Sequence, residues 1–78
     1  MNAPGELNQI DKLWELVRND PRTEGKGVGL RPGLYIIEIG GQDPFWQHHI
    51  DRERLMSDDL RAYAKEIVDE WEAELGTT

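Results

Sequence analysis

The C-terminal part of the chain carries an apolar pattern with the period of an α-helix. From Ser57 to Leu75, apolar residues return at three- and four-residue steps, while each residue of a helix advances by about 100°. The residues that gather on one side are Leu60, Tyr63, Ala64, Ile67, Val68, Trp71 and Leu75. Carboxylates occupy another side. The pattern predicts an amphipathic helix over 57–75, capped by Ser57, with an apolar face in a core and an acidic face in water.

An earlier stretch shows the same period. The residues that share one side of a helix there are Leu7, Ile10, Leu13, Trp14 and Val17. This helix should end at Asn19-Asp20-Pro21, because the residue before a proline is pushed out of the α region. From residue 21 to 33, glycines and prolines interrupt any regular period, which predicts a long loop.

The central part of the chain favours strands. Leu34 to Ile39 is rich in β-branched and aromatic residues, lies between glycines and is apolar on both faces. Gly40 to Pro44 has the length of a turn between antiparallel strands. We therefore expect Phe45 to about Arg52 to form a return strand.

Together these elements predict an α+β fold in the order helix, strand, strand, helix. We expect residues 1–78 to form one small domain, an antiparallel β-hairpin with two helices packed on one face. The ends, at about 1–5 and 76–78, should be flexible. The second face of the strand at 34–39 needs a cover, which the loop or a second copy of the chain would supply, so a homodimer is one expectation.

Charge and composition narrow the class of function. Sixteen acidic residues face nine basic ones, for a formal charge of −7, which opposes nucleic-acid binding and favours a partner protein with a basic surface. No cysteine is present, which excludes disulfides and thiolate chemistry. No stretch has the apolar length that crosses a membrane or the pattern of an export leader, so we expect a cytoplasmic protein.

Few residues suggest chemistry. On a strand, His49, Asp51 and Glu53 would project together, and a nitrogen with two carboxylates could hold Zn²⁺ or Mn²⁺. The alternative is that they are ordinary strand residues. The glycine-rich stretch with Lys26 and Arg31 lacks the Walker pattern and is better explained as a turn. We predict no catalytic residue and no cofactor.

The acidic face of the last helix is the strongest hint of function. Glu70, Glu72 and Glu74 lie in its final turns, where the negative end of the helix dipole disfavours carboxylates. Drift of surface composition could tolerate them, and selection for binding is the other explanation. The predicted partner-binding residues are Asp59, Glu66, Asp69, Glu70 and Glu74, with Phe45 and Trp46 as aromatic anchors. For Trp46, packing in the core is the competing interpretation.

These observations predict a small acidic binding protein without catalysis, acting as a regulator, inhibitor or accessory subunit. One concrete version is a nucleic-acid mimic that occupies a basic groove. A structural subunit of an oligomer or larger complex is the first alternative. A metal-binding enzyme or sensor that uses His49, Asp51 and Glu53 is the second.

Overall fold

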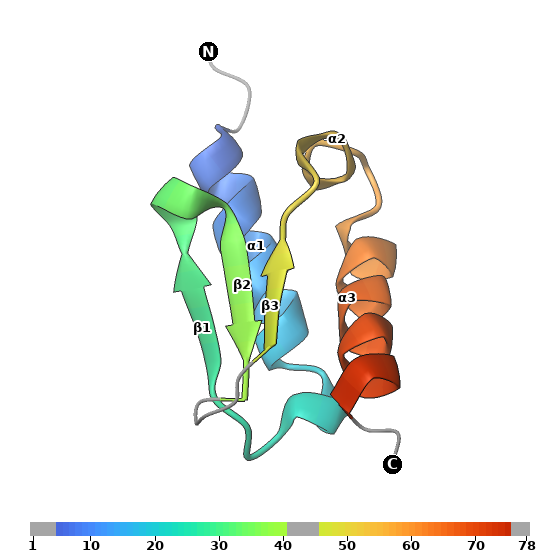
Figure 1. Ribbon diagram of the computed structural model, residues 1–78. Helices are drawn as coiled ribbons and strands as arrows, with labels where there is room; N and C mark the ends of the chain where they lie inside the picture. Colours follow the sequence, from blue (N-terminus) through green and yellow to red (C-terminus); the bar gives the residue numbers. More distant parts are fainter. Residues whose placement is uncertain (1–4, 41–45, 76–78) are drawn as a thin grey trace.

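An antiparallel sheet and two long helices make up the computed structural model, which describes residues 5–40 and 46–75 (Figure 1). The α+β class and the order helix, strand, strand, helix are confirmed, with a third strand and a short helix added. The elements in chain order are α1 Glu6–Arg18, η1 Pro21–Thr23, β1 Val28–Arg31, η2 Pro32–Leu34, β2 Ile36–Ile39, β3 Trp46–His49, α2 Arg52–Leu55 and α3 Leu60–Leu75.

The prediction of a long loop at 21–33 is wrong, because this stretch contains strand β1. β1 pairs with β2 in antiparallel register, from Val28 opposite Ile39 to Arg31 opposite Ile36. The indole N–H of Trp14 donates to the carbonyl of Val28 at 2.9 Å, so α1 holds the strand from its open edge. Short 3₁₀ turns flank β1, and they use the prolines that seemed to exclude regular structure.

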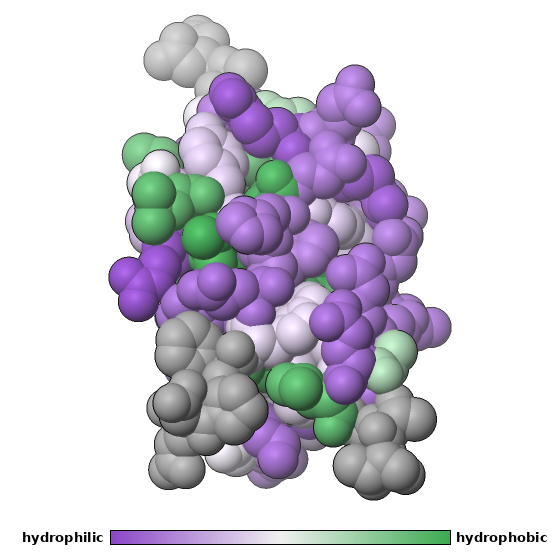
Figure 2. Space-filling model, viewed as in Figure 1, coloured by the Kyte–Doolittle hydropathy of each residue, from purple (hydrophilic) through white to green (hydrophobic). Residues whose placement is uncertain are grey.

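The two faces of the sheet differ in polarity. Strand order is β1-β2-β3, and the register places Ile37 between Leu30 and His48 on the face toward the helices. On the opposite face Glu38 accepts from Arg31 at 2.8 Å and from Gln47 at 2.9 Å. Figure 2 shows hydrophilic side chains over most of the described part of this face, with hydrophobic ones at the η2 end. The outer face of β2 is therefore mixed rather than broadly apolar, because it carries Glu38 together with Ile36, which is 8% exposed.

The strand at 34–39 starts two residues later than predicted. Leu34 belongs to η2 and is 65% exposed, while Tyr35 takes a left-handed backbone conformation with φ 56°. The hydroxyl of Tyr35 donates to Glu6 at 2.5 Å, which fixes this turn against the start of α1. Only from Ile36 onward does the chain run as a strand.

The core lies between the sheet and the two long helices. Figure 1 shows α1 behind the sheet and α3 alongside it, both running in the same direction. The fully buried side chains include Leu13 from α1, Ile37 from β2 and Ile67 from α3. Most predicted helix contacts are confirmed, but Leu7 and Leu75, at the outer ends of the two stripes, are 64% and 44% exposed.

The segment after β3 departs from the prediction. β3 ends at His49, and Arg52–Leu55 forms the short helix α2, which the side chain of Asp51 caps at 2.9 Å from the Glu53 N–H. Helix α3 begins at Leu60, three residues after Ser57. The hydroxyl of Ser57 donates to the Arg54 carbonyl, and Asp59 accepts the N–H of Ala62, so Asp59 replaces Ser57 as the cap.

Within the described ranges no helix has the length and apolar composition needed to cross a membrane. The predicted turn residues Asp43 and Pro44, the anchor Phe45 and the predicted ends 1–4 and 76–78 lie outside the described residues.

Candidate functional site

The acidic face of α3 lies next to two arginines from other elements. Glu66 accepts two hydrogen bonds from the guanidinium of Arg54, at 2.9 and 2.6 Å. The bond to Arg54 lowers the pKa of Glu66 below its usual value. The side chains of Glu66 and Arg54 are 51% and 39% exposed, so the pair adds little to stability. It does neutralise one carboxylate of the acidic face by a contact within the chain.

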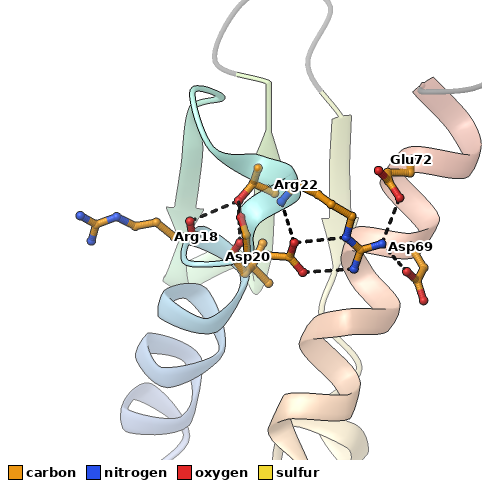
Figure 3. A network of polar contacts seen from close by, with 7 residues as sticks. Arg18, Asp20, Arg22, Asp69 and Glu72 are labelled. Atoms are coloured by element: carbon orange, nitrogen blue, oxygen red, sulfur yellow. Dashed lines mark hydrogen bonds and ion pairs between the residues drawn. The ribbon is translucent and has the colours of Figure 1, made fainter.

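Arg22 makes a second and larger connection to this face (Figure 3). Its guanidinium donates to Asp20 at 3.1 Å from both Nε and Nη2, and its Nη1 reaches Asp69 at 2.5 Å and Glu72 at 3.0 Å. Bonding to Arg22 lowers the pKa of Asp20, and the same carboxylates raise the pKa of Arg22. One cation therefore ties η1 to two turns of α3.

Glu70 faces a largely buried polar cluster rather than an arginine or lysine. Its carboxylate lies 3.5 Å from Nδ1 of His48, and Nε2 of the same ring lies 2.8 Å from the Tyr63 hydroxyl. The Tyr63 hydroxyl also accepts the N–H of Asp51 at 2.7 Å, which leaves its own proton available for donation to Nε2 of His48. This chain of contacts fits a neutral imidazole whose Nδ1–H points at Glu70.

The His48 cluster predicts a pH response of stability. Burial lowers the pKa of His48, and Glu70 opposes this shift without reversing it. The unfolded chain therefore binds a proton at His48 more readily than the folded chain does. The contribution of His48 to the free energy of unfolding is fully present above about pH 6.5 and is lost as the pH falls below that value. We expect the urea midpoint, followed by tryptophan fluorescence, to drop between neutral and mildly acidic pH.

Two variants check this pH response. His48→Gln keeps an acceptor for Tyr63 and a donor for Glu70 but cannot titrate, so its midpoint should stay flat in that range. His49→Gln removes the neighbouring exposed imidazole and should retain the drop. A drop that persists in His48→Gln would exclude the cluster as its source. Asp20, Glu38 and Glu66, whose pKa values are lowered, act in a separate window below about pH 4.5.

The remaining predicted partner-binding residues differ in their exposure and contacts. Asp59 is exposed and caps α3, and Glu74 is exposed in the last turn of the helix. Trp46 is 9% exposed and stacks beside His48 with ring centroids 5.8 Å apart. Trp46 therefore packs in the core, as the competing interpretation predicted, and the exposed anchor role of Phe45 lies outside the described residues.

The proposed metal ligands do not share the strand geometry on which their prediction depended. His49 is the last residue of β3, Asp51 uses its carboxylate to cap α2, and Glu53 lies inside that helix. Across residues 5–40 and 46–75, no group of three or more histidine and carboxylate side chains could hold a metal ion.

A groove between α1 and α3 was not predicted from the sequence. Two adjoining hollows of about 390 and 450 Å³ lie along these helices, and both are lined by Leu16 and Arg61. Leu16 lies off the predicted apolar stripe of α1, yet it is partly buried against the core. Its position off the stripe was the available signal, since a side chain there must lie at the border of the packed face.

Comparison of the chain with protein-family models, with curated proteins and with solved structures finds no match.

Proposed function

We propose that this chain is a small, non-catalytic protein-binding module of the cytoplasm that docks on a basic surface of its partner through the acidic face of α3. The observation that carries the proposal is the charge of this helix. α3 holds five carboxylates and only two cations, Arg61 and Lys65, which both lie in its first two turns. The other half of α3 is wholly acidic, although the helix dipole disfavours carboxylates there.

The intramolecular ion pairs leave this face acidic. Arg22 and Arg54 supply two positive charges to the five carboxylates, and Asp20 already takes part of the charge of Arg22. The arginines also hold Glu66 and Asp69 in place, so a partner meets an ordered set of acids rather than mobile side chains. An ordered acidic surface favours fast, salt-sensitive association with a basic groove, including one that binds nucleic acid.

The polar groups of the core suit a structural role. His48, Tyr63 and the backbone of Asp51 satisfy one another, and Tyr63 is only 3% exposed. Their hydrogen bonds join β3 to α3 and so fix the acidic helix against the sheet. This supports a rigid platform for binding.

The test is capture of partner proteins by the tagged chain, with identification of what is bound. The structure directs the choice of acids, because reversing Glu66 or Asp69 would also break the pairs with Arg54 and Arg22. We therefore combine Glu74→Lys with Glu70→Gln, and expect capture of the specific partner to fall at least about tenfold. Raising the salt concentration should have the same effect on the unmodified chain.

A matched control makes the same change in net charge elsewhere. Asp11→Lys combined with Glu24→Gln alters exposed residues of α1 and of the segment after η1. Capture should persist in this control. If both pairs of substitutions reduce capture equally, only the net charge matters and the acidic face of α3 has no specific role. If duplex DNA releases the partner, the nucleic-acid mimic is supported.

A further inference from the structure

The residues that line the groove between α1 and α3 come from these two helices, from η1 and from the segments next to them, and not from the strands. Its floor is formed by Leu16 of α1 with Leu60 and Ala64 of α3, and the two leucines remain partly exposed. The two hollows adjoin at Leu16 and Arg61, which line both, and together they follow the helix pair. A linear groove with an apolar floor has the shape that accepts an extended or helical segment.

The charges along the groove are unevenly distributed. Glu15, Asp58 and Asp59 line the end at the start of α3, where Lys12 and Arg61 are the two cations. Arg61 and Lys65, four residues apart on one face of α3, line the other half together with Arg22. Asp20, the one carboxylate lining that half, is bound by Arg22, and the charge of nearby Lys65 also helps to lower its pKa.

The basic half stands out against the rest of the chain. The formal charge of the protein is −7, yet exposed Arg61 and Lys65 lie side by side, and the structure gives neither an ion pair with another described residue. Two neighbouring cations beside an apolar floor are complementary to a carboxylate that is carried next to an apolar side chain.

From this arrangement we infer that the groove docks an acidic amphipathic segment of a partner protein. The segment's apolar side chain packs on Leu16, and its carboxylates pair with Arg61 and Lys65. The acids of the segment must point away from Asp58 and Glu15. The acidic end of the groove therefore sets the direction in which the segment binds. This site lies beside the acidic face of α3, with Arg22 contacting both, and does not rest on the function proposed above.

The probe is a synthetic helical peptide of about 16 residues, with leucine at every third or fourth position and glutamate between. Binding is followed by amide chemical shifts of the ¹⁵N-labelled chain. We expect saturable shifts at Leu16, Arg61 and Lys65 and small ones in β1 to β3. Arg61→Glu combined with Lys65→Glu should weaken the Kd at least about tenfold. A peptide with lysine in place of glutamate should not bind the groove.

The control variant is Lys26→Glu with Arg18→Glu, which makes the same charge change outside the groove lining. Equal weakening by this control, or shifts spread over the whole surface, would overturn the proposal. So would the absence of shifts at millimolar peptide. Sedimentation equilibrium tests whether a second copy of the chain, rather than a partner protein, occupies the groove. The unmodified chain could form a dimer, and the double variant Arg61→Glu with Lys65→Glu could dissociate it. That result would assign the groove to a second copy of the chain and would also overturn the inference.

Discussion

Replacing Ile37 by alanine is expected to cost about 2–5 kcal/mol of unfolding free energy. Ile37 is fully buried in the central strand, between Leu30 and His48 in the register of the sheet. A domain of this length has a total stability of roughly 4–12 kcal/mol, so the variant approaches the limit of folding. Urea unfolding followed by tryptophan fluorescence measures the loss.

Leu34→Ala is the matched control for this effect. Sequence patterning places Leu34 in the same strand as Ile37, but the side chain is 65% exposed in η2. Its truncation should change the unfolding free energy by less than about 0.5 kcal/mol. Equal losses in the two variants would mean that Leu34 is buried in the strand rather than exposed in η2.

The contrast between Leu34 and Ile37 shows what local patterns can and cannot predict. The apolar run from residue 34 to 39 indicates a strand correctly, because β-branched residues favour one wherever they pack. The point where the strand begins depends on Tyr35, whose hydroxyl reaches Glu6 across 29 positions of sequence. Nothing within the run itself encodes that contact.

Strand β1 was missed for a related reason. Its four residues include only two apolar ones, separated by Gly29, so the stretch carries too little pattern for a strand. The glycine suits the close approach of β2, because a Cβ at this position would lie 3.3 Å from a carboxylate oxygen of Glu38 and would make that side chain shift slightly. The alternation of Val28 and Leu30 was the available signal, and the surrounding glycines and prolines obscured it.

The acidic face of α3 could be predicted from helical periodicity alone, because the side of a helix on which a residue lies depends only on local geometry. The ion partners of this face could not be predicted in the same way. Arg22 lies 47 positions before Asp69, and Arg54 lies 12 positions before Glu66. Their positions follow from how η1 and α2 pack beside α3, which charge patterning along one helix does not report. The groove is likewise a property of two helices together.

Arg22→Met is expected to destabilise the chain by about 1–2 kcal/mol. Methionine retains the aliphatic stem but leaves Asp20, Asp69 and Glu72 without the guanidinium that they share. The estimate is modest because Asp69 and Glu72 are about half exposed, while Asp20, at 17%, contributes most. Urea unfolding at low ionic strength measures the loss, and added salt should reduce it.

Neutralising the exposed carboxylates tests whether charge causes the loss of stability in Arg22→Met. In the Arg22→Met chain, Asp69→Asn with Glu72→Gln removes the repulsion left on α3 and should restore part of the lost stability. The same two changes in the unmodified chain remove partners of Arg22 and should lower stability, so their effect changes sign with residue 22. Additive effects would mean that Arg22 acts by packing, and the connection from η1 to α3 would then not depend on charge.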